Sequence, residues 1–194
     1  MSEISILCGL GNPGADYRGT RHNLGSETID LLSERHNLHW EKTAGPVLES
    51  RWGFSGGEVF LLKPLTFMNA SGDALAGYRD LDPGSLLVIC DDINLPLGRL
   101  RLRERGSSGG HLGLESIISR LGSEGFARLR LGIGSPPSAV EWSEYVLSPF
   151  LGEEMERVER MCRAAADALE TVLREGLETA MHLFNRRPFP PTTP

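Results

Sequence analysis

The sequence predicts an α/β protein with a single twisted mixed β-sheet and helices on both faces. Short apolar runs typical of buried strands alternate with longer segments whose apolar residues recur at helical spacing. Two strand-like segments, 46–52 and 58–63, are separated only by a glycine-rich stretch, which indicates an antiparallel hairpin and makes the sheet mixed. We find no internal repeat, so we expect one domain over residues 1–185, followed by a disordered proline-rich tail over 186–194.

In the first half of the chain, an apolar run over 4–8 predicts a strand, and residues 23–35 predict a helix that stops near Asn37. After the hairpin, Pro64 ends its strand and Thr66 is placed to cap a helix that runs towards Arg79. The hairpin linker, residues 53–57, spells G-x-S-x-G, the turn that carries the nucleophile of serine hydrolases. That turn requires a helix after it, and a strand follows here, so Ser55 is interpreted as a structural residue.

In the second half, the apolar run 85–90 predicts a central strand, and arginine alternates with leucine over 99–103 as in a strand with one wet face. The glycines and serines of 106–110 open a helix that Gly122 stops, and free backbone amides at such a start can bind an anion. Residues 126–133 predict another strand. A long amphipathic helix over 153–174 and a shorter one after Gly176 complete the fold.

The composition is that of a globular protein, with 40% hydrophobic and 24% charged residues. The N-terminus has no secretory pattern, and no apolar run reaches the ~20 residues of a membrane helix, so we expect a cytoplasmic protein without membrane partners. Cys8, Cys90 and Cys162 are odd in number and far apart, which favours free thiols in a reducing compartment. No pair of cysteines has metal-ligand spacing, so no metal site is expected.

The chain is acidic overall, with a formal net charge of −6, which argues against a protein that coats nucleic acid without selectivity. One stretch, residues 99–130, is nevertheless basic, with seven arginines and three glutamates. A local basic patch favours limited phosphate contact, as with one end of a nucleic acid. A solvated strand face explains alternating arginines equally well, so charge alone leaves both interpretations open.

Polar residues crowd the turn after the first strand. Gly9, Gly11 and Gly14 spell the G-x-G-x-x-G of dinucleotide sites, but a helix must open at the third glycine, and here the plausible helix begins only near Asn23. His22 alone would be a surface histidine, whereas the dense polar set around it indicates a site. Asp91 directly follows a buried strand, as a turn residue or as the partner of a catalytic histidine.

Taken together, the motifs resemble those of bacterial peptidyl-tRNA hydrolases. The resemblance covers roughly residues 4 to 184 in order and rests on the segments 9–14 with Tyr17 and Thr20 to Asn23, Lys63-Pro64 with Thr66 to Asn69, Asp91-Asp92 with Leu95-Pro96, Gly106 to His111, Arg128 to Gly134, and Tyr145 to Leu147 with Phe150. It implies hydrolysis of the ester that joins a peptide to the 3′ ribose of tRNA, by a monomer that uses neither cofactor nor metal.

The resemblance also implies roles for individual residues. His22 would be the general base that activates water, Asp91 would fix its tautomer, and Asn69 would steady the attacked carbonyl or the water. The substrate-binding positions implied are Asn12, Tyr17, Met68, Asn69, His111 and Leu112. The positions implied to meet phosphates of the acceptor stem, below the 3′ CCA end, are Arg101, Arg103, Arg105, Ser107 and Ser108.

The chain departs from the family pattern at Leu112, where members commonly carry an asparagine that helps to hold substrate. Ser135 likewise stands where a basic residue is frequent. Neither change touches the predicted catalytic set. Two alternatives stay open at this point: a non-catalytic RNA-binding relative with the same fold, and, more distantly, a dinucleotide-binding enzyme.

Overall fold

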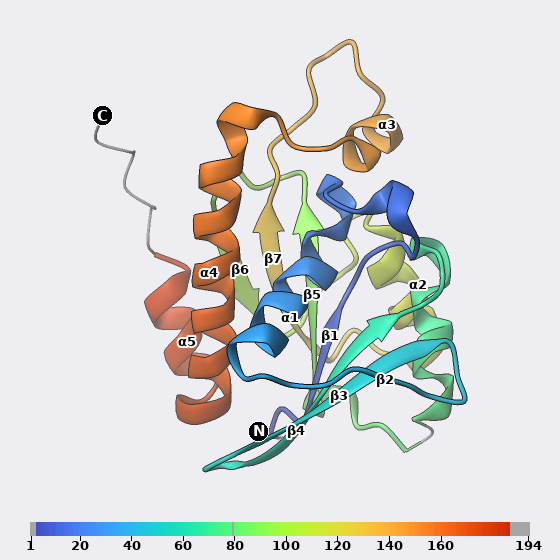
Figure 1. Ribbon diagram of the computed structural model, residues 1–194, viewed down its shortest axis with the longest axis vertical. Coiled ribbons are helices and arrows are strands. Elements are labelled where there is room, and N and C mark those ends of the chain that lie inside the picture. Colours follow the sequence, from blue (N-terminus) through green and yellow to red (C-terminus); the bar gives the residue numbers. More distant parts are fainter. Residues whose placement is uncertain (1–2, 79, 187–194) are drawn as a thin grey trace.

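The computed structural model describes residues 3–78 and 80–186, which fold around one seven-stranded sheet (Figure 1). The strands are β1 (Ile6–Gly9), β2 (Glu41–Lys42), β3 (Val47–Phe54), β4 (Gly57–Pro64), β5 (Leu86–Asp92), β6 (Leu100–Arg103) and β7 (Ala127–Gly132). Their order across the sheet is β2-β3-β4-β1-β5-β7-β6. β1 is parallel to β4 and β5, and β5 to β7, whereas the β2–β3, β3–β4 and β6–β7 pairs are antiparallel. The predicted mixed sheet is therefore confirmed.

Helices cover both faces of this sheet. The α-helices are α1 (Leu24–Arg35), α2 (Leu112–Leu121), α3 (Trp142–Leu147), α4 (Gly152–Glu175) and α5 (Leu177–Phe184), and the 3-10 helices are η1 (Ala15–Tyr17), η2 (Arg21–Asn23), η3 (Met68–Gly77) and η4 (Pro83–Ser85). Buried residues of α1, α4 and α5 join one hydrophobic core, and those of α2 and η3 join a second core on the other face. The predicted helices on both faces are confirmed.

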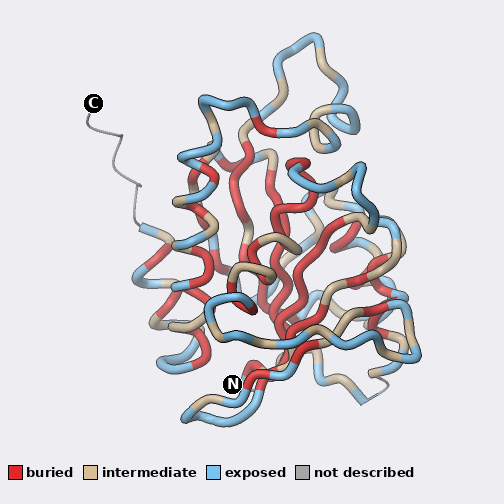
Figure 2. Tube along the Cα trace, viewed as in Figure 1, coloured by how far each residue is buried: buried red, intermediate tan, exposed pale blue. Residues whose placement is uncertain are grey.

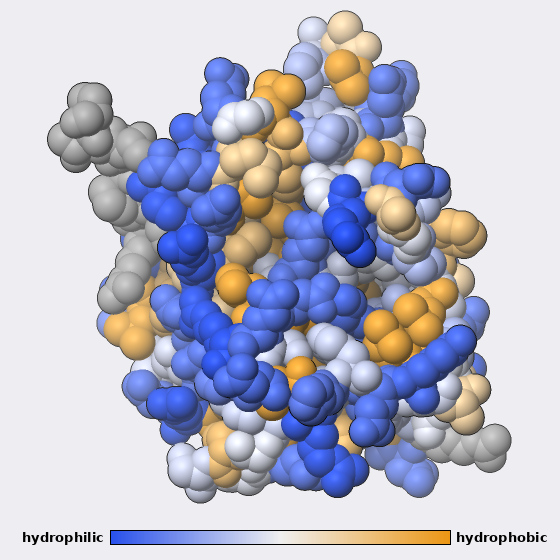
Figure 3. Space-filling model, viewed as in Figure 1, coloured by the Kyte–Doolittle hydropathy of each residue, from blue (hydrophilic) through white to orange (hydrophobic). Residues whose placement is uncertain are grey.

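The two cores follow from the alternation of side chains along each strand. In β5, Leu87 and Ile89 belong to the core under α1 and α4, whereas Leu86 and Val88 belong to the core under α2 and η3. All four are fully buried, and each is worth about 2 kcal/mol of burial. Figure 2 shows the central strands in the buried colour. In Figure 3, hydrophilic residues line the outer side of α4, and apolar residues fill the seam between α4 and α1.

The parallel strands bring the polar segments of the sequence to one edge. β1, β4, β5 and β7 run in the same direction, so their carboxyl ends meet at the same edge of the sheet. The loop after β1 contains η2, the loop after β4 leads into η3, and β5 ends in Asp91 and Asp92. Residues from three separate parts of the chain therefore meet there.

The start of α1 rests directly on the backbone of two strands. Gly25 lies in its first turn, where an added Cβ would overlap the carbonyl oxygens of Ile89 and Leu10. The Ser26 N–H donates to the Leu10 carbonyl at 2.8 Å, and the Leu10 N–H donates to the Ile89 carbonyl at 3.0 Å. A glycine is required at this close approach, which sets the position of η2 over the strand ends.

Several local predictions are confirmed and others are wrong. Asn37 has a φ of 50° just beyond α1, and Gly122 ends α2 in the left-handed region, as the stop signals predict. The segment around Ser55 is the predicted hairpin turn between β3 and β4. Thr66, however, caps no helix. Its Oγ1 is buried without a hydrogen-bond partner among the described residues, and η3 starts two residues later, as a 3-10 helix with a kink at Ala70.

Two elements were not predicted because their sequences lack a periodic apolar pattern. β2 consists of two exposed residues, and α3 contains no buried residue. Arg79, towards which the helix after Pro64 is expected to run, lies outside the described residues, and so does the predicted tail after Arg186. Within the described part of the chain, none of the helices has the length and apolar character to cross a membrane.

Candidate active site

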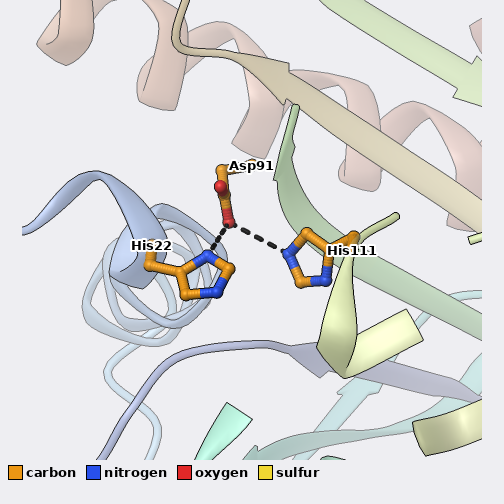
Figure 4. A group of neighbouring side chains, drawn as sticks. All are labelled: His22, Asp91 and His111. Atoms are coloured by element: carbon orange, nitrogen blue, oxygen red, sulfur yellow. Dashed lines mark hydrogen bonds and ion pairs between the residues drawn. The ribbon is translucent and has the colours of Figure 1, made fainter. Parts of the chain in front are cut away.

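Two histidines share one carboxylate oxygen at the carboxyl edge of the sheet (Figure 4). Nδ1 of His22, in η2, lies 2.8 Å from Oδ1 of Asp91, the penultimate residue of β5. Nε2 of His111, just before α2, lies 3.1 Å from the same oxygen. The imidazole centroids are 4.9 Å apart. The predicted His22–Asp91 pair is thus brought together, and His111, predicted only to bind substrate, joins it.

The tautomer of His111 follows from its second role as the N-cap of α2. Its Nδ1 accepts the backbone N–H groups of Gly113 at 3.1 Å and Leu114 at 3.3 Å. Because a backbone amide can only donate, Nδ1 must carry a lone pair, and the ring proton of the neutral imidazole sits on Nε2. His111 therefore donates to Asp91 and anchors the start of α2 to the end of β5.

Asp91 is held as an anion. Burial opposes its ionisation, but the electrostatic attraction and hydrogen bonds of His111 and His22 outweigh burial and place the pKa of Asp91 well below its ordinary value. The carboxylate accepts the Nδ1–H of His22, which leaves the lone pair of that ring on Nε2. Nε2 has no hydrogen-bond partner among the described residues, and His22 lines a cavity. It is therefore available as a base.

The same three side chains have ligand atoms within 4.8 Å of one another, a grouping that could also hold a metal ion. A metal needs a lone pair from each ligand. Here the two ring nitrogens nearest Asp91 are positioned as N–H donors to the carboxylate, and Nδ1 of His111 is occupied by two backbone amides. Hydrogen bonds thus account for the cluster without a metal.

A cavity of about 280 Å³ opens in front of this cluster. It has a polar floor and a largely apolar wall, lined by His22, Asp91, Asp92, Ile93, Asn94, Gly109, Gly110, His111, Leu112, Arg130, Trp142, Ser143 and Val146. Leu112 and Trp142 are apolar yet 52% and 61% exposed. A water beside His22 would share this space with an apolar or aromatic part of a ligand.

Asn12 and Asn23 brace the loop after β1. The Asn12 N–H donates to Oδ1 of Asn23 at 2.8 Å, and Nδ2 of Asn23 donates back to the Asn12 carbonyl at 3.0 Å. Oδ1 of Asn12 accepts the backbone N–H of Met68, at the start of η3, at 2.8 Å. This bond turns the Asn12 NH₂ group away, free to donate to a ligand. Sequence reasoning did not single out Asn23, although it lies in the same polar run.

Other predicted substrate-binding residues lie around this brace. Met68 is buried under α2, where an added Cβ at Gly113 would lie 2.6 Å from its sulfur. Asn69 is exposed and lines a separate hollow, which shares Leu112 with the catalytic cavity. Tyr17 packs edge-on against Phe67 with ring centroids 6.2 Å apart. The structure therefore groups His22, Asp91, His111 and Leu112 around one cavity, whereas Asn69 and Tyr17 lie beside it.

The predicted phosphate contacts belong to a larger cluster. Arg101 and Arg103 of β6 stand directly opposite Arg130 and Arg128 of β7, so the four side chains leave the same face of the sheet, here called the four-arginine face. Arg101 and Arg103 are exposed, and so is Arg105 beyond them, and none of the three has an ion-pair partner among the described residues. Arg128 is only 1% exposed.

The two β7 arginines organise the loop 104–111. Arg128 donates to the carbonyls of Gly106, Ser107, Glu124 and Phe126, and Arg130 to those of Ser107 and Ser108 and to Asp92. Burial and the nearby Arg130 lower the pKa of Arg128 to about 10, so it stays protonated at neutral pH. The two arginines thus hold this loop beside the edge of the sheet where Asp91 and Asp92 lie.

The expected anion site at the start of α2 is partly occupied by the protein itself. The side chain of His111 accepts the amides of residues 113 and 114, so these groups are not free. In the preceding loop, the Ser108 hydroxyl bonds to Glu115 at 3.3 Å and accepts the Gly110 N–H. The Ser107 side chain is exposed.

Comparisons with known proteins identify the family of this chain. The sequence matches the profile of the Peptidyl-tRNA hydrolase family over residues 6–192. The chain belongs to the peptidyl-tRNA hydrolase family. A relative named Peptidyl-tRNA hydrolase from Synechococcus sp. (strain JA-3-3Ab) is 47% identical over 94% of this chain and 83% of its own. Another from Chloroflexus aurantiacus is 44% identical over 93% and 98%.

Solved structures of the family share the fold. The crystal structure of peptidyl-tRNA hydrolase from Acinetobacter baumannii superposes with a TM-score of 0.89 at 30% identity, covering 96% of both chains. A complex of peptidyl-tRNA hydrolase with N-propanol gives 0.91, also at 30% identity, covering 98% of both. Membership of the peptidyl-tRNA hydrolase family confirms the predicted resemblance and the predicted hydrolase class, and nothing in the comparisons favours a non-catalytic relative.

The dinucleotide alternative fails on local structure. In this peptidyl-tRNA hydrolase family member, Gly14 is followed by the single 3-10 turn η1, and α1 opens only at Leu24. The fingerprint needs the third glycine at the start of the helix that meets the pyrophosphate. Two of the glycines serve close packing instead: an added Cβ would lie 2.5 Å from the Gly25 carbonyl oxygen at Gly9 and 2.5 Å from the Ser26 hydroxyl at Gly11, whereas Gly14 has a φ of 107°.

Proposed function

We propose that this chain hydrolyses the ester between the peptide and the 3′ ribose of peptidyl-tRNA, with His22 as the general base. The observation that carries the proposal is the His22–Asp91 pair at 2.8 Å, with the second nitrogen of His22 unpaired beside a cavity. Family membership supplies the substrate, since the curated relatives are named peptidyl-tRNA hydrolases.

The chemistry follows from the tautomers. Nε2 of His22 takes a proton from water as the water oxygen attacks the ester carbonyl, and Asp91 stabilises the imidazolium formed. The tetrahedral intermediate then collapses, the bond from the carbonyl carbon to the ribose oxygen breaks, and the His22 proton passes to that oxygen. The products are free tRNA and a peptide carboxylate, which releases the remaining proton.

We propose that two side-chain amides, those of Asn12 and Asn69, bind the substrate near its ester carbonyl. Asn12 keeps its NH₂ group free because its oxygen is bound to the Met68 N–H, which supports a role in holding the peptide. Asn69 follows Met68 in the first turn of η3 and is exposed, so its amide can reach a ligand at the cavity mouth. Tyr17 and Leu112 shape the apolar surface beside these amides, with Tyr17 towards the 3′ adenosine, and the buried Met68 acts through its backbone N–H, which orients Asn12.

The acceptor stem is proposed to lie against the four-arginine face and Arg105, below the CCA end in the cavity. Loop carbonyls and Asp92 engage Arg128 and Arg130, whereas Arg101, Arg103 and Arg105 are exposed and lack ion pairs among the described residues. Unpaired arginines beside like charges attract an anion strongly, and phosphates are bound without regard to base sequence. Ser107 and Ser108 border the same surface.

We further propose that the chain acts as a cytoplasmic monomer without a metal. His22, Asp91 and His111 all come from one chain, which supports a site complete in a monomer. Hydrogen bonds account for the atoms that a metal would need. Cys8, Cys90 and Cys162 are free, as in a reducing compartment.

The test is release of an N-acetyl-aminoacyl group from tRNA by the parent chain, His22→Ala and the matched control His39→Ala, whose histidine is exposed. We expect His22→Ala to lose ~100-fold or more in kcat while it still binds tRNA, and His39→Ala to keep full activity. Activity should survive a metal chelator. A parent chain that binds tRNA but releases nothing would overturn the proposal and restore the RNA-binding alternative.

A further inference from the structure

Arg21 is a buried cation next to the catalytic base, with no part in the chemistry above. Arg21 is 4% exposed. Its guanidinium forms a two-pronged ion pair with Glu154, in which Nη2 donates to Oε2 at 2.7 Å and Nη1 to Oε1 at 3.2 Å. The same group lies over two aromatic rings, with Cζ 4.4 Å from the centroid of Tyr145 and 4.5 Å from that of Phe150. A guanidinium enclosed in this way is held in one orientation.

Among the described residues, the hydrogen-bond, ion-pair and ring partners of this guanidinium all belong to the segment 145–154, which runs from α3 into the first turn of α4. Besides the two rings and Glu154, the Ser148 hydroxyl lies 3.4 Å from Nε of Arg21. The backbones are joined too: the Arg21 N–H donates to the Ser148 carbonyl at 3.0 Å, and Thr20 forms a β-bridge with Pro149. Arg21 thus links the catalytic loop to α3.

α3 depends on this link. None of its six residues is buried, and Figure 2 shows α3 and the loop before it in the exposed and intermediate colours. A helix this short is not stable by itself, and in α3 only the partly buried Tyr145 and Val146 pack against the hydrophobic core. Tyr145 anchors it, through its ring on Arg21 and its hydroxyl, which donates to the Ile133 carbonyl at 2.7 Å.

α3 also forms one wall of the catalytic cavity. Trp142, Ser143 and Val146 line it, opposite Leu112 and the loop before α2. Trp142 presents a large ring that is 61% exposed, so a ligand in the cavity would contact it. The position of that ring relative to His22 is set through Tyr145 and Arg21, the residue before the base.

We propose that Arg21 is a positioning residue that fixes α3 as the substrate-contacting wall of the catalytic cavity. The inference rests on the proposed function, because it takes the cavity to be where peptidyl-tRNA is held. Arg21 touches no reacting atom. It sets the distance between the Trp142 wall and His22, and through that distance it sets the affinity for substrate.

The central variant is Arg21→Lys, which keeps the charge but loses both the two-pronged bond to Glu154 and the guanidinium contacts with the two rings. We expect KM to rise about tenfold and kcat to stay within threefold. Glu154→Gln removes the charge of the partner while keeping its size, and should raise KM in the same direction by a smaller factor. It also carries the test if Arg21→Lys fails to fold.

Arg35→Lys is the matched control. Arg35 also forms ion pairs with α4, to Asp167 at 2.7 Å and Glu170 at 3.4 Å, but it extends from α1 away from the cavity. This variant should leave KM unchanged. Trp142→Ala should raise KM by itself, and the double variant Arg21→Lys/Trp142→Ala should be no worse than the poorer single, because a displaced α3 no longer presents the ring.

The outcomes separate the inference from the function. A KM that Arg21→Lys leaves at the Arg35→Lys value would overturn the inference, and so would a fall in kcat with KM unchanged, or effects of Arg21→Lys and Trp142→Ala that multiply. In each case the parent chain still hydrolyses substrate and the proposed function stands. A parent chain without hydrolysis overturns the function, and the inference with it.

Discussion

The arginines of β6 and those of β7 have the same sequence pattern but opposite surroundings. Arg103 and Arg128 stand directly opposite each other, as do Arg101 and Arg130. Arg128 has its guanidinium surrounded by four backbone carbonyls and the ring of Phe126, at 4.4 Å, whereas Arg103 is exposed and has no ion pair among the described residues. The arginines of β7 are bonded within the fold, whereas those of β6 are the ones that we propose to bind phosphates.

The difference between the two pairs of arginines arises from the path of the chain after β6. The loop after β6 turns back along β7, so its carbonyls cover Arg128 and Arg130 and leave Arg101 and Arg103 outside. Like charges opposite each other on a sheet repel. Within the described part of the chain, only Arg128 and Arg130, the inner pair, are bonded to carbonyls and a carboxylate of the protein that offset this repulsion. The outer pair, Arg101 and Arg103, has no such internal compensation among the described residues and faces solvent, where the proposed phosphate contacts would lie.

The largest effect is expected at the inner pair. Arg128→Met removes the donor to four backbone carbonyls and should lower the free energy of unfolding by about 3 kcal/mol, measured by chemical denaturation. Arg103→Met, the same substitution at the directly opposite position, should change it by less than about 0.5 kcal/mol. Equal losses for the two variants would break the comparison.

Asp91 resembles the two β7 arginines, because it is a charged group whose partners, His22 and His111, lie within the protein. Asp91→Asn should lower kcat ~100-fold or more, because an amide can hold His22 in the wrong tautomer, and should lower the free energy of unfolding by about 2 kcal/mol at neutral pH.

The sign of its pH dependence follows from the lowered pKa. As pH falls, the unfolded chain binds a proton at Asp91 near the ordinary value of 3.8, before the folded chain does. The stabilisation by this carboxylate is therefore complete above roughly pH 5 and is lost on acidification. The difference in unfolding free energy between the parent and Asp91→Asn should be flat from neutral pH to roughly pH 5 and shrink below it. A difference that grows on acidification would contradict this account.

A smaller effect, on affinity alone, is expected at the outer pair. The double variant Arg101→Ala/Arg103→Ala should weaken tRNA binding about tenfold and make its salt dependence shallower by the loss of about two phosphate contacts, with stability unchanged. Arg163→Ala/Arg174→Ala, which removes the same charge from exposed positions of α4, is the control. The comparison fails if both double variants change the salt dependence alike.

The smallest effect is expected at Leu112, which is half exposed at the cavity mouth. Leu112→Asn restores an amide that family members commonly carry and should lower KM up to about fivefold, within the ~1 kcal/mol of one hydrogen bond. Steady-state kinetics measure this change, and kcat should stay the same. A higher KM would show that the apolar side chain itself contributes to binding here.

The fold and the His22–Asp91 pair could be predicted from the sequence because both follow from general rules. Alternating strands and helices imply an open sheet, and polar residues after buried parallel strands gather at one edge. The second role of His111 could not be read in this way, since it depends on where the cap of α2 meets β5. The burial of Arg128 could not be predicted either. The alternation of residues along a strand shows which side chains share a face of the sheet, but not which other parts of the chain cover that face.

Local signals failed where packing overrode them. Thr66 is a good cap by residue type, but the close approach of η3 to α2 sets the start and the tight winding of that helix: an added Cβ at Gly72 would overlap the Ser116 carbonyl. α3 has no apolar period because only its partly buried Tyr145 and Val146 pack against the core, and Tyr145 is also held by Arg21. No residue pattern along the chain records such a link.

The glycine contact at the start of α1 has a consequence for how the site tolerates change. With Gly25 on the Ile89 and Leu10 carbonyls, the separation between the helix that follows His22 and the strand that leads into Asp91 is set by two backbones in contact. Side chains elsewhere in the core can adopt new rotamers after a substitution, but a backbone contact has no rotamers to change. Repacking at a distance should therefore be absorbed before it reaches the base and its carboxylate, while the α3 wall, held by side chains, is free to diverge.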